Sequence, residues 1–104
     1  MITVTAELRI NEGKETEALA AIEKLVAAVN ANEPGALTYS WHRDLKDPLQ
    51  ILVYEVWADD EATEVHRASE HQAEFNKAFS RASGVFDPGS VKISRFERIA
   101  AIER

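Results

Sequence analysis

The chain has 104 residues, of which 45% are hydrophobic and 29% are charged, a composition typical of one globular domain rather than of a disordered segment. Its net charge of −6 argues against binding to nucleic acid or to an anionic membrane surface, because both need a basic patch. The absence of cysteine excludes disulfides, thiolate metal sites and cysteine nucleophiles.

The first half of the chain predicts a strand, a helix and a second strand. Residues 2–10 alternate between apolar and polar side chains, which is typical of a half-buried strand. Apolar residues recur at helical spacing over residues 13–31, and Pro34-Gly35 is expected to end this helix. Residues 36–44 then predict the second strand.

The second half of the chain predicts a third strand, a second helix and a fourth strand. A turn at Lys46-Asp47-Pro48 is expected to join the second strand to a third at residues 50–57, as a hairpin. Asp59 or Asp60 is expected to cap a second helix, which carries apolar residues as far as Phe79. Asp87-Pro88-Gly89 predicts a turn, and residues 91–99 predict the last strand.

The predicted order β-α-β-β-α-β is that of a ferredoxin-like α+β fold, with one antiparallel sheet and two helices on one face, formed by a single domain over residues 1–104. The third strand is apolar on both faces, and two helices can cover only one of them, so we expect a homodimer packed sheet to sheet. No apolar run approaches the length of a membrane span, and no signal-peptide pattern begins the chain. A cytoplasmic protein is therefore the expectation.

Three stretches of the chain resemble the antibiotic biosynthesis monooxygenase (ABM) family: EPGALTYSW from residue 33, DPLQILVYEVW from residue 47 and EATEVHRASEHQAEF from residue 61. The matching residues are Glu33, Pro34, Gly35, Tyr39, Asp47, Pro48, Tyr54, Glu55, Trp57, Ala62, His66, Ser69, His71 and Phe75. The predicted first strand, first helix and last strand also fall where the family has them. The resemblance therefore covers nearly the whole chain.

The resemblance implies a dimeric α/β barrel in which each subunit holds a pocket between its sheet and its helices. It also implies a cofactor-independent monooxygenase that acts on a quinol or polyphenolic aromatic substrate with molecular oxygen. Because one fold can carry several reactions, two alternatives stay open. One is an isomerase or lyase acting on a small oxygenated metabolite, and the other is a dimeric ligand-binding protein without catalysis.

Two candidate catalytic residues lie on the third strand. Trp57 resembles a tryptophan that lines the pocket of the tailoring oxygenases, although a large core residue at the end of the barrel would fit the pattern equally well. Glu55 occupies a mid-strand position where a carboxylate is costly unless it is paired. It is a base whose pKa is raised by burial, or it forms a structural ion pair with Arg9, Arg43 or Arg95, which is the interpretation we favour.

Two more candidate catalytic residues, His66 and His71, lie on the second helix. Five positions correspond to about 500° around an ideal helix, so the two side chains would not share a face of a straight helix. Ser69-Glu70-His71 resembles the family's break between two helical pieces, and such a break would turn His71 inward. A neutral histidine is well suited to accept a phenolic proton near neutral pH, whereas a surface or cap histidine is the ordinary alternative.

The expected substrate-binding residues are Tyr39, Tyr54 and Phe75, each of which would otherwise be an ordinary packing residue. No dinucleotide or P-loop motif is present, so no organic cofactor is expected. No metal site is expected either, because the histidines lack an i, i+4 pair and His42 lies on another element. The resemblance places Asn76 where haem-binding members carry their axial histidine, which argues against haem.

Overall fold

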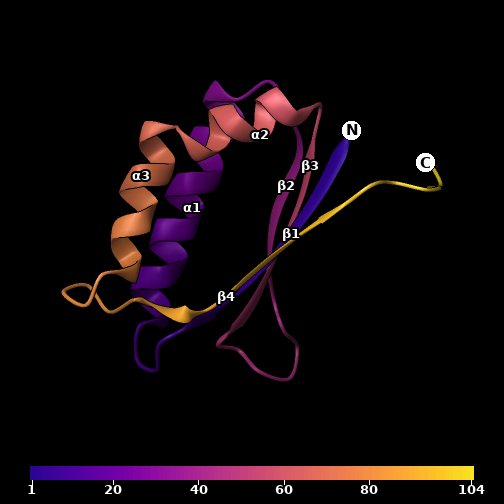
Figure 1. Cartoon of the computed structure of the whole chain (residues 1–104). Helices are drawn as coiled ribbons and strands as arrows, with labels where there is room; N and C mark the ends of the chain where they lie inside the picture. The colour runs from indigo at the N-terminus through magenta and orange to yellow at the C-terminus, as the bar shows by residue number, and fades with distance from the viewer.

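The computed structural model describes all 104 residues (Figure 1). Along the chain the elements are β1 (Ile2–Ile10), α1 (Glu15–Asn32), β2 (Ala36–Arg43), β3 (Gln50–Trp57), α2 (Asp60–Arg67), α3 (Glu70–Asn76), the 3-10 turn η1 (Lys77–Phe79) and β4 (Phe86–Phe96). This order confirms the predicted β-α-β-β-α-β pattern, with the second helix divided into two pieces.

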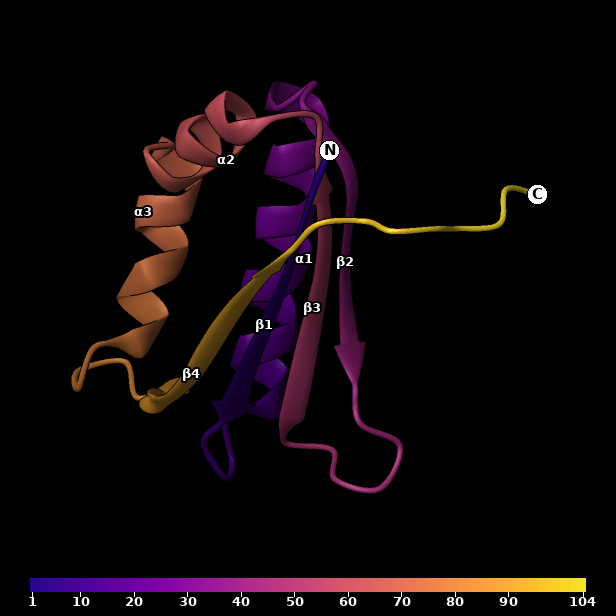
Figure 2. The same cartoon turned by 45° about the vertical axis from the view of Figure 1, so that its right-hand side comes forward.

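The four strands form one antiparallel sheet in the order β2-β3-β1-β4. All the helices lie on the same side of this sheet, with α3 packed beside α1 and α2 at the end of β3 (Figures 1 and 2). The ferredoxin-like fold is therefore confirmed. The outer strands β2 and β4 are edge strands, and β1 and β3 form the centre of the sheet.

The last strand differs from its prediction. A turn was expected at residues 87–89, but β4 begins at Phe86, which pairs with Ile10 of β1. A register shift follows between Glu7 and Arg9 of β1, and the Arg9 backbone N–H there donates to the Ser90 side chain of β4 instead of to a backbone carbonyl oxygen. Proline is tolerated at an edge strand or bulge, because no ladder hydrogen bond needs its missing N–H, so Pro88 does not end this strand.

The hydrophobic core lies between the sheet and the helices. Every second residue of β1 and β3 points into it, and α1 contributes one buried stripe at helical spacing. The largest fully buried side chains are Trp57, Phe86, Ile10, Val29 and Val53. No helix is both long enough and apolar enough to cross a membrane.

The outer face of the sheet is only partly covered. Leu52 is 42% exposed, Tyr54 37% and Phe96 52%. Beyond β4 the chain runs away from the sheet (Figure 2), and Ile99 and Ile102 in this segment are largely exposed. These apolar side chains therefore have little contact with the rest of their own chain.

Candidate active site

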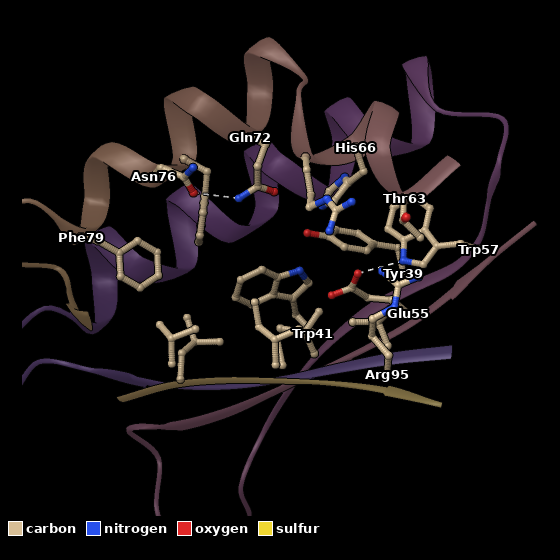
Figure 3. Close-up of a pocket in the computed structure, with 18 of the residues that line it drawn as sticks. Tyr39, Trp41, Glu55, Trp57, Thr63, His66, Gln72, Asn76, Phe79 and Arg95 are labelled. Carbon is tan, nitrogen blue, oxygen red and sulfur yellow. Dashed lines mark hydrogen bonds between the residues drawn. The ribbon is translucent and has the colours of Figure 1, made fainter. Parts of the chain in front are cut away.

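A cavity of about 650 Å³ lies between the helix-facing side of the sheet and the α2–α3 pair (Figure 3). All four strands, both short helices and η1 contribute side chains to its wall, and most of these side chains are apolar. The cavity extends over the inner side of β4, where Val91 and Ile93 line it and are 41% and 65% exposed. It is therefore a pocket open to solvent and not a sealed void.

Aromatic rings form much of the pocket wall. Trp41 and Phe75 meet edge to face, with ring centroids 5.3 Å apart. The Tyr39 ring lies 6.0 Å from the Trp57 ring and 5.3 Å from that of His66. Such walls suit a flat aromatic ligand, which can pack against several ring faces and edges at once.

Two polar groups of this wall bear on ligand recognition. Trp41 Nε1 is buried and has no hydrogen-bond partner in the protein, which is unusual for a buried donor. Burial also raises the pKa of the Tyr39 hydroxyl well above its ordinary value, although the neighbouring Trp41 indole N–H partly opposes the rise, so this hydroxyl stays protonated. The indole N–H is thus available to a ligand that carries an oxygen acceptor.

Glu55 is the buried carboxyl group of the pocket. It faces inward because it alternates with Tyr54 and Val56 along β3, and it is 9% exposed. Its Oε1 accepts a hydrogen bond of 2.9 Å from Trp57 Nε1. Burial raises the pKa of Glu55 to about 7, with a further contribution from the Glu33 charge, although the Trp57 hydrogen bond partly opposes the rise.

The arginines considered as partners for Glu55 have other contacts or none. Arg9 pairs with Asp47 at 2.7 Å, and Arg95 pairs with Asp60 at 2.7 Å. Arg43 makes no salt bridge. The structural ion pair favoured from the sequence is therefore not formed, and Glu55 can exist as a neutral acid or as a carboxylate near neutral pH.

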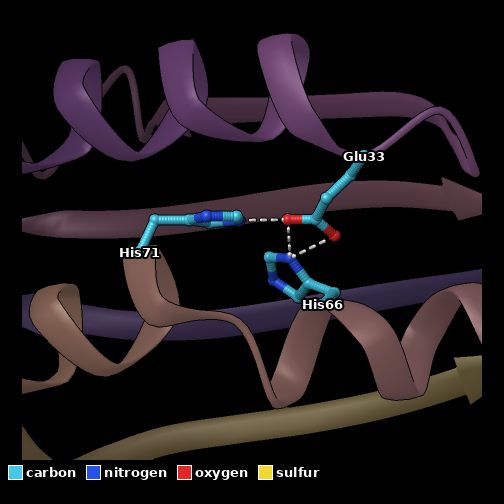
Figure 4. Close-up of side chains that lie close together, drawn as sticks. All are labelled: Glu33, His66 and His71. Atoms are coloured by element: carbon cyan, nitrogen blue, oxygen red, sulfur yellow. Dashed lines mark hydrogen bonds and ion pairs between the residues drawn. The ribbon is translucent and has the colours of Figure 1, made fainter.

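Beside the pocket, three side chains from three helices converge (Figure 4). Glu33 caps the C-terminal end of α1, His66 lies in the last turn of α2 and His71 in the first turn of α3. His66 Nδ1 lies 3.0 Å and 3.1 Å from the two Glu33 carboxylate oxygens, and His71 Nε2 contacts the same carboxylate. The three ligand atoms are all within 4.8 Å of one another, a spacing that could hold a metal ion.

The break between α2 and α3 makes this convergence possible. Ser69 has extended backbone angles and caps the start of α3. Its Oγ donates to the His66 carbonyl oxygen and accepts from the Gln72 backbone N–H. The chain therefore changes direction between the two histidines. Their ring centroids lie 6.4 Å apart, and the break between the two helical pieces lies where the resemblance led us to expect it.

A close backbone approach positions Glu33. A Cβ atom on Gly35 would lie 2.6 Å from the Cβ of Ala62 in α2, so a side chain at residue 35 would push α2 away. The Gly35 carbonyl oxygen also accepts from the Ala58 backbone N–H at 2.9 Å. Gly35 thus holds the end of α1 against the start of α2.

The structure brings together most of the residues that the sequence singled out. Pocket-lining residues among them are Tyr39, Glu55, Trp57, His66 and Phe75. His71 does not line the pocket and reaches it only through Glu33 and His66. Tyr54 points to the outer face of the sheet, because it alternates with the pocket-lining residues of β3.

Sequence reasoning missed two features of the site. Glu33 was counted among the residues that match the family but was given no role in the site, and its position directly before Pro34-Gly35 was the available signal. Trp41 was not among the expected site residues, although it lines the pocket. Asn76 also lines the pocket, where its Oδ1 accepts a hydrogen bond from Gln72 Nε2 at 2.9 Å.

Comparison with known proteins finds one matching family and several solved structures with a similar fold. Residues 1–78 match the family described as "Antibiotic biosynthesis monooxygenase". PA3566 from Pseudomonas aeruginosa is 28% identical, with a TM-score of 0.82 over 95% of this chain and 94% of that one. A protein from Caulobacter crescentus CB15, provisionally described as an antibiotic biosynthesis monooxygenase, is 25% identical, with a TM-score of 0.83 over 95% and 90% of the two chains. Among curated proteins, none matches the sequence.

Proposed function

The chain belongs to the antibiotic biosynthesis monooxygenase family, and we propose that it is a cofactor-independent monooxygenase of electron-rich phenols or quinols. The observation that carries this proposal is Glu55, a buried carboxyl with a pKa of about 7 in the wall of an aromatic pocket. A general base works best when its pKa lies near the working pH. Glu55 meets this condition without a charged partner.

In the proposed reaction, the Glu55 carboxylate accepts the proton of a ring hydroxyl. The resulting anion passes one electron to molecular oxygen, and the two radicals combine to form a carbon–oxygen bond. The peroxide anion then takes back the proton held by Glu55, which gives a hydroperoxide and restores the carboxylate. With an anthrone-type substrate, the hydroperoxide then loses water, so that one oxygen atom ends in the new carbonyl group and the other in water. The electrons come from the substrate, and the protein supplies position, exclusion of water and a proton acceptor.

The pocket side chains would divide the remaining work. Phe75, Trp41 and Tyr39 pack against the ring system of the substrate. The Trp41 indole N–H, which has no partner in the protein, would donate to an oxygen of the bound anion. Trp57 holds the Glu55 carboxyl in place through its hydrogen bond, and it acts as a positioning residue.

Oxygen consumption with anaerobically reduced naphthoquinols and anthrones tests this proposal. We expect uptake above the uncatalysed rate, reduced by about 10²-fold or more in Glu55→Gln, because general bases typically contribute 10²–10⁴-fold. Tyr54→Phe is the matched control, since it alters the neighbouring residue on the opposite face of β3. Substrate turnover under argon would favour an isomerase or lyase instead, and binding without product would favour a ligand-binding protein.

We also propose that the chain forms a homodimer through the outer face of its sheet. The exposed apolar side chains of Leu52, Tyr54 and Phe96 on this face, together with Ile99 and Ile102 beyond β4, support the proposal. Sedimentation equilibrium of the wild type and of Leu52→Lys tests it. We expect a dimer that the lysine weakens, and a monomeric wild type would contradict the proposal.

A further inference from the structure

The inference concerns the cluster of Glu33, His66 and His71, and it does not depend on the proposed oxygenase activity. We propose that these three side chains bind one divalent transition-metal ion of the zinc type. The ion would join the end of α1 to the break between α2 and α3, and so hold the helical wall of the pocket in place. The chemistry proposed for Glu55 does not pass through this ion.

The first argument is the convergence of the donor atoms. His66 presents Nδ1, His71 presents Nε2, and both nitrogens face the carboxylate of Glu33 (Figure 4). Zinc binds imidazole nitrogen and carboxylate oxygen at about 2.0–2.2 Å, so ligand atoms around one tetrahedral ion lie about 3.3 Å apart. The 3.0 Å between His66 Nδ1 and Glu33 Oε2 is close to that value, whereas His71 Nε2, which contacts the same oxygen, has to move away from it to admit the ion.

The second argument is charge. The Glu33 side chain is only 3% exposed, and no lysine, arginine or backbone N–H contacts its carboxylate, whose hydrogen bonds all go to the two imidazole rings. A buried carboxylate is costly unless a positive charge offsets it. A bound cation would supply that charge, and each neutral imidazole would then contribute a lone pair.

The third argument concerns which ion fits. Two nitrogens and one oxygen favour Zn²⁺ and the neighbouring transition metals, whereas Ca²⁺ and Mg²⁺ prefer sets of oxygen ligands. Three protein ligands leave at least one coordination position for water or a small anion. The His71 side chain keeps 18% of its surface exposed, which gives an ion a route from solvent.

Metal binding to the chelator-treated full chain tests the proposal. We expect saturable binding of one Zn²⁺ per chain in competition with a chromophoric chelator, and visible absorption bands when Co²⁺ replaces Zn²⁺. His71→Ala and Glu33→Gln should each weaken binding by at least about 100-fold, because even the loss of a group supporting a metal ligand costs 10–100-fold. His42→Ala is the matched control, since it removes the one histidine outside the cluster.

A second measurement keeps the test decisive if a variant fails to fold. In the wild type, NMR spectra of the three imidazole rings during Zn²⁺ addition should show changes for His66 and His71, with His42 unaffected. Three results would each overturn the proposal: no saturable binding, binding by folded His71→Ala that is as tight as in the wild type, or equal perturbation of all three rings. If the wild type binds Zn²⁺ as expected but shows no oxygen uptake with the naphthoquinols and anthrones, that result counts against the proposed function alone.

Discussion

The raised pKa of Glu55 makes a prediction about stability. The pKa is about 7 in the folded protein against an ordinary value of 4.5, so between these values the folded state holds a proton that the unfolded chain has released. Unfolding then releases a proton, and the free energy of unfolding falls as the pH rises. The stabilisation is complete below pH 4.5 and is lost as the pH passes through about 7.

The size of the effect follows from the same two values. The 2.5-unit difference (7 − 4.5 = 2.5), at about 1.4 kcal/mol for each unit, corresponds to about 3 kcal/mol. This is a large part of the roughly 5–15 kcal/mol by which a domain is stable. Glu55→Gln stays neutral at every pH and can still accept the Trp57 hydrogen bond, so it should escape the loss.

Urea denaturation of both proteins measures the difference. Between about pH 5 and about pH 8, the unfolding free energy of Glu55→Gln should rise relative to the wild type by about 2–3 kcal/mol. Glu7→Gln, which removes an exposed carboxylate from β1, controls for the change in net charge. A difference between wild type and Glu55→Gln that stays constant over this range would refute the reasoning.

Three further predictions use other features of the site. Gly35→Ala should lower the free energy of unfolding by about 1–3 kcal/mol through the clash with Ala62. Adding Ala62→Gly should restore part of the loss in thermal melts, and a double variant no more stable than Gly35→Ala would contradict the clash. Trp57→Phe should raise the pKa of Glu55 further, because it removes a hydrogen bond that lowers it; a lower pKa in a carboxyl NMR titration would contradict this. Tyr54→Ala should leave quenching of the tryptophan fluorescence by a naphthoquinone unchanged, since both tryptophans line the pocket and Tyr54 does not. Weaker quenching in this variant would mean that Tyr54 takes part in ligand binding.

The spacing of apolar residues was enough to predict the fold, because strands turn every second side chain toward the core and a helix turns one stripe of side chains toward it. The strands and α1 follow these repeats closely, and the two turn regions around β2 and β3 carry clear signals. The start of β4 was misplaced because Pro88 and Gly89 usually mark a turn, whereas here they lie within an edge strand near a bulge. The local sequence does not reveal whether a strand is an edge.

The candidate site was predictable only where alternation along a strand determined the direction of a side chain. Glu55 and Trp57 share a face with the buried residues of β3, so their inward position follows from the sequence. The contact of Glu33 with His66 and His71 joins residues at least 33 positions apart and depends on how three helix ends pack. No short-range pattern determines such a contact, which is why the role of Glu33 in the site was not predicted.

The two buried carboxyl groups behave differently because their partners differ. Glu33 lies between two imidazole rings, whereas Glu55 has one indole N–H, and the negative charge of Glu33 is one of the factors that raise the pKa of Glu55. A cation bound at Glu33 would offset this charge. Zn²⁺ should therefore lower the pKa of Glu55 in a carboxyl NMR titration, by less than the full rise, because burial remains the larger cause. An unchanged pKa at saturating Zn²⁺ would mean that the two carboxyl groups are electrostatically independent.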